Sequence, residues 1–417
     1  MEEGFPFHFP VSASLISLFN VLVYLLDVAL DVWTIVALYH ERDYVYMGVL
    51  IALLLFSSIL VNTFSWIWYS DTETSVDKFV TKYHLLGPLH FVLLGVFLRM
   101  ASLMELSIAK LQKTNDLFQE GVAAHLKHDL SILRLFETFS ESVPQLVLMI
   151  VIKLTQEQEL QLVTGVKIAG SFISVAMSVL FFHRDMRDFA PKKQKMGWSG
   201  SIVYFLWNLL LITSRVVAIA LFASILPCYI ALHFLCLWLL FFLWAWREKT
   251  DFMEIPEGEN SQKEWLFRAT VGLIWYFSWF NVSSGQTRVK SNIYHACMGA
   301  DMALLLGLWF WRRSIESAHL GPSPVNLYVM IITLPLLYLI GILIKLLYYW
   351  KFHPNLTASQ VTIQDKKDKP KAMLCRVAAA DAVIDVNLVT DSFEAVAQPA
   401  ISSANKRMRN MAVNFYS

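Results

Sequence analysis

Charge and cysteine are both scarce in this sequence. Of its 417 residues only 16% are Asp, Glu, Lys or Arg, and their near balance leaves a formal net charge of +1. Such a chain has no global attraction for nucleic acid. Its four cysteines, at positions 228, 236, 297 and 375, show no CxxC spacing. We therefore expect no metal site, no disulfide framework and no cofactor.

Motifs of covalent chemistry are missing as well. The sequence contains no HExxH, no Walker phosphate loop and no GxGxxG. GWSG at 197–200 has the form of an intramembrane serine protease motif, but no histidine is spaced to serve as its base, and Ser199 is better explained as a helix cap. We therefore expect a protein that is not an enzyme.

Apolar residues, by contrast, are abundant. The sequence is 56% hydrophobic and 14% aromatic, which is typical of a polytopic membrane protein. A helix needs about 20 mostly apolar residues to cross the hydrocarbon core of a bilayer. Ten segments are candidates: 12–38, 44–69, 83–104, 130–152, 162–182, 201–226, 228–246, 265–281, 291–311 and 325–350.

The positions of lysine and arginine limit how many of these segments cross. The loop HRDMRDFAPKKQK at 183–195 and the stretch DKKDKPK at 365–371 are both basic, and basic loops stay in the cytoplasm. Five candidates separate them, and an odd number of crossings cannot return the chain to the same side. Segment 265–281, which is short and contains Arg268, is therefore expected to be re-entrant. A cytoplasmic N-terminus requires a second re-entrant segment, which we place within 83–152.

The predicted fold is an all-α polytopic membrane protein with about eight transmembrane helices and two re-entrant helices. Residues 1–350 form its membrane domain, residues 351–417 form a cytoplasmic regulatory tail, and both termini are cytoplasmic. Backbone that enters the membrane without crossing is tolerated only where protein or water covers it. The fold therefore implies a shielded or wet interior.

Ionisable residues recur inside the candidate spans, and several share one helix face. They are Asp27 and Asp31 in the first span, Arg134, Glu137 and Glu141 in the fourth, Lys167 in the fifth, and Arg215 and Asp301 further on. In the fourth span Gln145 continues the stripe and Pro144 predicts a kink.

These charges must pair or contact water, because each unpaired one costs about 2.5–3.5 kcal/mol at the bilayer centre. Five acids against three bases leave two acids over, for which Arg99 or Arg184, protonation or water would have to account. Two interpretations stay open. The charges either only hold the bundle together, or they converge into one continuous hydrophilic path for a charged or zwitterionic solute.

Several motifs, taken in chain order, resemble a known family. They are LLDVALDVW, LRLFETFSESVPQL, SIVYFLWNLLLITSRVVAIALF, ALHFLCLWLL, TDFM, YFSWFNV and LLYYWKFHP. In this order they resemble the XK-related protein family over about residues 15–355, and NKRMRNMAVNFY near the C-terminus is a fainter match. RLFETF followed by PQL is the most specific part of the resemblance.

The resemblance implies a plasma-membrane phospholipid scramblase, which moves phosphatidylserine, phosphatidylcholine and other lipids between leaflets without ATP. It implies two related halves, about 12–182 and 201–350, and delivery by a single-pass immunoglobulin-type partner, basigin or neuroplastin. Residues that match the family's lipid path are Asp27, Asp31, Glu137, Glu141, Arg215 and Asp301, and Arg134 lies on the face of Glu137.

Two further expectations concern control. Tyr46, beside one end of the second span, is a candidate gate, although an ordinary interfacial aromatic is an equal alternative. One branch of the family is activated by caspases, which cut after aspartate. Asp368 closes the motif DKKD but precedes a lysine, and Asp391 precedes Ser392 but lacks an upstream acid. Caspase cleavage or phosphorylation of the tail during apoptosis is therefore expected to activate the protein.

Other functions fit the same residues. Acids inside spans also build proton relays and ion paths, so an ion channel or proton-coupled transporter is the alternative. A scaffold that only escorts partners is a third interpretation. Phosphatidylserine exposure without a matching conductance distinguishes a scramblase from a channel.

Overall fold

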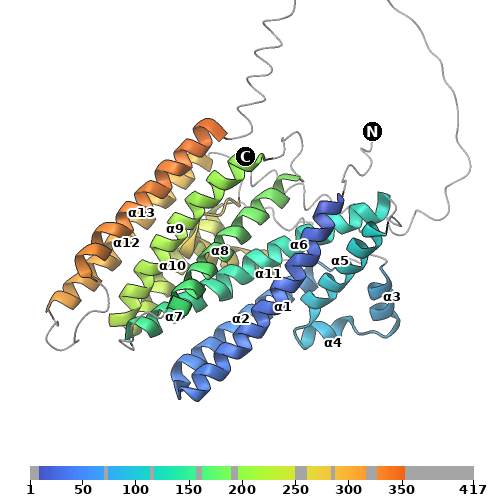
Figure 1. Cartoon of the computed structure of the whole chain (residues 1–417), viewed down its shortest axis with the longest axis horizontal. Coiled ribbons are helices and arrows are strands. Elements are labelled where there is room, and N and C mark those ends of the chain that lie inside the picture. Colours follow the sequence, from blue (N-terminus) through green and yellow to red (C-terminus); the bar gives the residue numbers. More distant parts are fainter. Residues whose placement is uncertain are drawn as a thin grey trace, which may run out of the picture.

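The computed structural model describes residues 9–69, 74–112, 117–155, 162–188, 196–248, 261–282, 287–315 and 326–352. Within these ranges the regular elements are helices, and none of the described residues forms a strand. Long helices run side by side, with α1 and α2 toward one side of the bundle and α12 and α13 toward the other (Figure 1). The tail beyond residue 352, with Asp368 and Asp391, lies outside the described residues.

Eight helical stretches of the described chain are long and apolar enough to cross a membrane. They are α1 (Val11–His40), α2 (Tyr44–Ile67), α6 (Leu117–Glu137) joined by η1 (Thr138–Ser142) to α7 (Val143–Thr155), α8 (Leu162–Asp188), α9 (Trp198–Ile225), α10 (Pro227–Arg247), α12 (Thr287–Ile315) and α13 (Leu327–Leu347) followed by η2 (Tyr348–Phe352). Large apolar side chains such as Phe19, Trp33 and Leu240 stay exposed, as contact with lipid requires. The prediction of an all-α polytopic protein with eight spans is confirmed.

Two of the ten candidate segments form helices too short to span. α5 (Gly95–Leu111) and α11 (Ser261–Phe277) have 17 residues each. At 1.5 Å per residue such a helix is about 26 Å long, against about 30 Å of hydrocarbon. Segment 265–281 was expected to be re-entrant, and it forms one of these short helices. Segment 83–104 forms the other, because α4 (Leu86–Phe91) and α5 replace one continuous helix there, and it lies within 83–152, where the second re-entrant segment was expected. That either segment re-enters the membrane stays a prediction.

One side chain of α2 stabilises the break between α4 and α5. Leu93 has a φ of 64°, so the backbone leaves helical geometry there. Buried Asn62 accepts a hydrogen bond from the Gly95 N–H at 2.8 Å and donates one to the Leu93 carbonyl at 3.1 Å. A Cβ on Gly95 would lie 2.2 Å from His90 Cδ2, so any larger residue would have to displace the buried His90 ring. The break is therefore satisfied by protein, as non-helical backbone at this depth requires. The short helix α3 (Ser75–Lys82) precedes it.

α9 is the central helix of the bundle. It packs against α7, α8, α10, α12 and α13, and 61% of its most apolar stretch is buried, against 11% for α1. α11 packs closely on α10 at Gly272, which has no Cβ to hold the two backbones apart. A Cβ at this position would lie only 3.2 Å from the Phe242 backbone nitrogen. The interior is therefore built around α9, and α1 and α10 face outward.

The order of long and short helices repeats along the described chain. In each half, two long helices come first, a short helical stretch follows, and two more long helices end the series. The short stretch is α3, α4 and α5 between α2 and α6–α7 in the first half, and α11 between α10 and α12 in the second. This order agrees with two related halves at about 12–182 and 201–350. That the halves are related stays a prediction.

Candidate functional site

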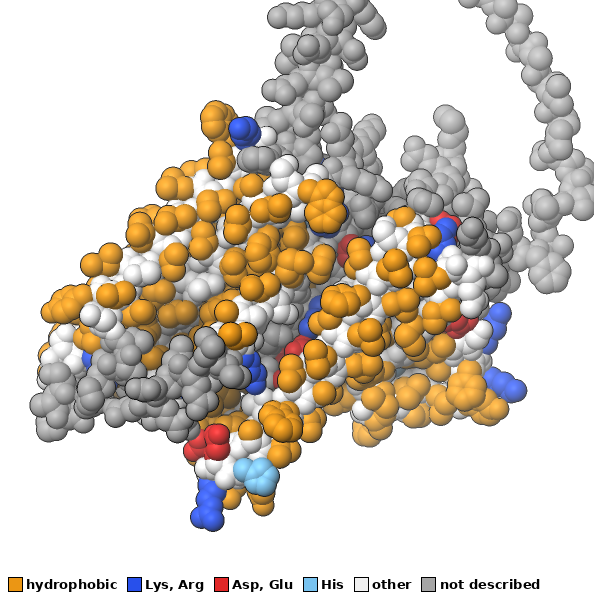
Figure 2. Space-filling model, viewed as in Figure 1, with side chains coloured by type: hydrophobic (Ala, Val, Ile, Leu, Met, Phe, Trp, Pro, Cys, Tyr) orange, Lys and Arg blue, Asp and Glu red, His pale blue; other side chains and the backbone are white. Residues whose placement is uncertain are grey.

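A cleft of about 490 Å³ lies between α1 and the helices α6, α7 and α8. Figure 2 shows red and blue atoms in the seam of an otherwise apolar face, where the part containing α1 meets the rest of the bundle. The ionisable and amide side chains that line the cleft are Asp27, Asp31, Glu41, Arg134, Gln145, Lys153 and Lys167. The polar faces expected on the first, fourth and fifth spans therefore converge on one cleft.

Arg134 is the centre of the ion pairs at this cleft. One guanidinium nitrogen donates to Glu137 at 2.9 Å and another to Asp27 at 2.8 Å. The guanidinium also lies 5.6 Å from the centroid of the Tyr24 ring, within cation–π range. The side chains of Arg134 and Asp27 are 25% and 37% exposed, whereas that of Glu137 is 10% exposed. The Asp27–Arg134 pair thus borders the cleft and the Glu137 contact supports it from inside.

Of the five acids expected inside the spans, Asp31 and Glu141 are the two that make no ion pair within the described part of the chain. Asp31 accepts a hydrogen bond from Gln145 Nε2 at 2.5 Å and lies within hydrogen-bonding reach of Glu141. Glu141 is buried and also faces Ser57. The two acids in excess over the bases therefore lie next to each other, one on α1 and one on η1.

The two arginines considered as partners for this surplus bond elsewhere. Arg99 is buried and donates to Asp129 at 2.7 Å and to Ser65. Arg184 donates to Ser201 at 3.4 Å. Lys167 reaches the cleft from α8 and donates to Thr34 at 3.3 Å.

A π-helical turn places Glu141. Pro144 lacks an N–H and cannot continue the α-helical bonding toward residue 140. The π-helical turn η1 lies just before Pro144, at the place where the sequence predicted a kink. Ser140 in this turn donates to Ser57 of α2 at 2.8 Å. Single π turns inside α-helices occur frequently at functional sites, because they re-aim the following side chains.

Tyr46 lies at one end of the cleft. Its hydroxyl is 3.3 Å from that of Thr155, and its ring packs against a cluster formed by Leu38, Leu50 and Ile152. These three apolar residues line the cleft. The position is suitable for a gate and equally for an interfacial aromatic, so the role of Tyr46 stays a prediction.

Arg215 and Asp301 lie apart from this cleft. Arg215 on α9 donates to Asp301 on α12 and to the Tyr276 carbonyl, and it lines a second cavity that shares no lining residue with the first. Neither residue is therefore among those that line the cleft, and their place on one continuous path stays a prediction. Helix periodicity groups residues on one helix, but it does not show which helices are neighbours.

Sequence reasoning missed His233 as part of the Arg215 network. Its Nε2 is 3.0 Å from Asp301 Oδ1, and its Nδ1 is 3.0 Å from the Tyr276 hydroxyl. The available signal was weak: His233 is a lone polar residue within the apolar segment ALHFLCLWLL. The sequence alone does not reveal which residues on neighbouring helices a lone histidine in such a segment contacts.

Comparisons with known proteins extend over most of the chain. The family model described as XK-related protein matches residues 15–354. XK-related protein 8 of Tetraodon nigroviridis is 40% identical over 430 residues, which covers 100% of this chain and 99% of that protein. XK-related protein 8 of Gasterosteus aculeatus is 42% identical over 82% of this chain and 83% of its own length. That of Pan troglodytes is 35% identical over 80% and 82%, respectively.

Proposed function

Because the chain belongs to the XK-related protein family, we propose that it is an ATP-independent phospholipid scramblase. It would let phosphatidylserine, phosphatidylcholine and other lipids pass between leaflets. The observation that carries this proposal is the cleft, where acids and bases from several spans line an indentation in an apolar face.

The cleft suits a zwitterionic head group. Such a group resists crossing about 30 Å of hydrocarbon for the same reason as any unpaired charge. Its phosphate would contact Arg134 and Lys167, and its amine or ammonium would contact Asp27 and Asp31. The acyl chains would stay in the bilayer beside the exposed apolar residues of α1. The protein would lower a transfer barrier and would make or break no bond.

Reconstitution of the purified full-length protein tests this proposal. Vesicles carry a trace of head-group-labelled fluorescent lipid, and dithionite is added to bleach the outer leaflet. Because scrambling returns inner-leaflet lipid to the outside, we expect bleaching to continue past the outer-leaflet share. Protein-free vesicles serve as the control. Bleaching that stops at the outer-leaflet share with folded protein present, untreated or caspase-treated, would contradict the proposal.

The cellular setting is part of the same proposal. We expect a plasma-membrane location with both termini in the cytoplasm and delivery by basigin or neuroplastin. Activation would follow caspase cleavage at Asp368 or Asp391, or phosphorylation of the tail, during apoptosis. These expectations rest on family membership and on the aspartates and serines of the tail.

An ion channel or proton-coupled transporter is a second candidate. It is favoured by the two neighbouring carboxyl groups of Asp31 and Glu141, since paired acids at membrane depth can relay protons. Annexin binding and whole-cell current, measured on the same cells, separate the two. Lipid exposure without a matching current supports scrambling, and a current without lipid exposure supports a channel.

A further inference from the structure

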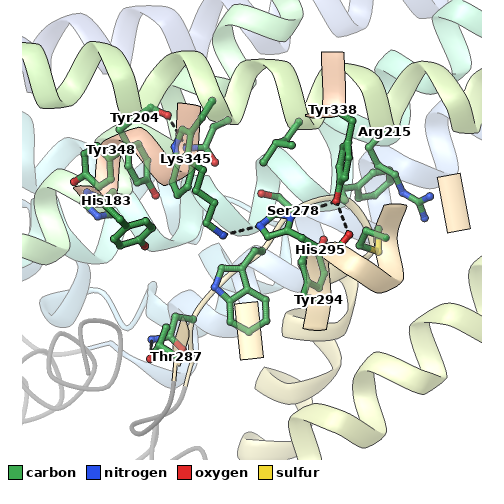
Figure 3. Close-up of a pocket in the computed structure, with 18 residues that line it drawn as sticks. His183, Tyr204, Arg215, Ser278, Thr287, Tyr294, His295, Tyr338, Lys345 and Tyr348 are labelled. Atoms are coloured by element: carbon green, nitrogen blue, oxygen red, sulfur yellow. Dashed lines mark hydrogen bonds between the residues drawn. The ribbon is translucent and has the colours of Figure 1, made fainter. Parts of the chain in front are cut away.

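A second cavity, of about 80 Å³, lies beside α9, α12 and α13. Figure 3 shows Lys345, His295, Tyr338 and Arg215 in a row along it. α9 contributes Tyr204, Trp207, Asn208 and Arg215, and α13 contributes Tyr338 and Lys345. The cavity is distinct from the cleft described above, and the proposed scrambling does not use Lys345 or Trp207.

Lys345 brings a positive charge into this buried place. It is 7% exposed, and its Nζ donates to Ser291 Oγ and lies 2.6 Å from His295 Nε2. The other ring nitrogen of His295 is 3.2 Å from the Tyr338 hydroxyl, which itself donates to the His295 carbonyl at 3.1 Å. These bonds form together when Lys345 donates to Nε2 and the Nδ1–H donates to Tyr338. Lys345 makes no ion pair with a carboxylate in the described part of the chain.

Two further donors line the cavity without an acceptor. Within the described residues, Trp207 Nε1 and one terminal guanidinium nitrogen of Arg215 have no hydrogen-bond partner. Trp207 and Arg215 are only 6% and 1% exposed. Both groups can donate but not accept. A buried donor left without an acceptor is destabilising by about 1–3 kcal/mol, so each indicates a missing partner.

The remaining wall of the cavity offers no negative charge. None of the described residues that line it is Asp or Glu. Trp207 is close to the cation, since Lys345 Nζ lies 5.1 Å from its ring centroid. A buried ammonium, two unused N–H donors and a wall without carboxylates together favour an occupant that is negatively charged and accepts several hydrogen bonds.

We propose that this cavity binds a phosphate-type oxyanion. Lys345 supplies the opposing charge and Trp207 donates from Nε1. Arg215, whose charge is paired with Asp301, offers its unused terminal N–H from the other end of the row. A single water needs about 10–15 Å³ of such space, so 80 Å³ holds a group of several atoms but not a whole lipid. The oxyanion is therefore either a free inorganic phosphate or the phosphate of a head group whose chains stay outside.

The test measures thermal unfolding of the purified full-length protein in detergent. Inorganic phosphate is titrated in one arm and water-soluble dihexanoyl phosphatidic acid in the other, each against sodium chloride at matched ionic strength. We expect a saturable rise of the unfolding midpoint with at least one of the two phosphates and none with chloride. Lys345→Met and Trp207→Phe should each raise the half-saturating concentration by about tenfold or more.

Lys351→Met is the matched control, because Lys351 is an exposed lysine on the turn that follows α13. It should respond as the unchanged protein does. A response to phosphate alone assigns a free anion, and one to the lipid analogue assigns a head group; both support the site. Equal responses of all variants, an equal response to chloride, or no response to either phosphate would overturn it. If Lys345→Met does not fold, Trp207→Phe carries the test, since it removes one N–H and keeps a ring.

Discussion

Asp31 is an acid at membrane depth whose donor is an amide, Gln145, rather than a base. Asn at this position can still accept that hydrogen bond, so Asp31→Asn removes charge with little change in packing. We expect it to slow scrambling in vesicles by about tenfold or more, which corresponds to about 1.4 kcal/mol of barrier. Ser171→Ala, in the same cleft, should leave the rate unchanged, because Ser171 bonds only to the Lys167 carbonyl of its own helix among the described residues. An unaltered rate in Asp31→Asn would remove this residue from the path.

Variants of Arg134 distinguish a structural role of the charges from a role in lipid transport. Arg134→Met leaves Glu137 buried without its base, which is expected to lower the free energy of unfolding by about 3–5 kcal/mol. Adding Glu137→Gln removes the buried uncompensated charge and should recover most of that loss, since the other partner, Asp27, is 37% exposed. We expect scrambling to stay slow in the double variant, because the cleft still lacks the guanidinium of Arg134.

Unfolding curves and scrambling rates, measured on the same preparations, check this prediction. If the charges only hold the bundle together, the scrambling rate should return along with the stability. The Arg134 variants therefore distinguish the two interpretations that the sequence left open.

At the scale of helices, the length of the apolar runs predicted the spans, but contacts between helices decided the rest. Segment 83–104 is apolar enough to suggest a span, and its break depends on Asn62, which comes from another helix. The fourth span was expected to begin at 130, whereas α6 begins at Leu117. Its first turns contain charged residues that lower its apolarity. Two of these, Lys127 and Asp129, pair with Asp185 and Arg99, partners that no local pattern reveals.

Asn62 carries the stability of the α4–α5 break. Asn62→Leu removes the acceptor for the Gly95 N–H and the donor to the Leu93 carbonyl, which leaves two backbone groups unsatisfied. We expect the free energy of unfolding to fall by about 2–4 kcal/mol, seen as a lower midpoint in thermal denaturation. Thr63→Val is the matched control, because among the described residues Thr63 bonds only to the Ile59 carbonyl within its own helix. Equal midpoints for Asn62→Leu and Thr63→Val would show that other contacts hold the break.

At the scale of the whole molecule, one long-range ion pair joins the first and third spans of each predicted half. In the first half Asp27 of α1 pairs with Arg134 of α6. In the second, Arg215 of α9 pairs with Asp301 of α12, so the signs of the charges are exchanged. These pairs bridge 107 and 86 residues of sequence, which is why helix faces alone could not assign them. The sequence thus predicted which residues are polar at depth, but not that they form two separate groups.

Control by the tail is a prediction for the whole chain, because residues 353–417 lie outside the described membrane domain. We expect the full-length protein in vesicles to scramble slowly, and caspase added to these vesicles to raise the rate by about tenfold. We expect one of the variants Asp368→Ala and Asp391→Ala to lose the rise in rate on adding caspase. The variant that loses it identifies the cleavage site. Asp31→Asn in the same protein should stay slow after cleavage, since cutting the tail does not restore the charge in the cleft. Equal scrambling rates before and after complete cleavage would contradict activation by caspase. Phosphorylation would then be tested on a kinase-treated sample in which Asp368 and Asp391 are intact.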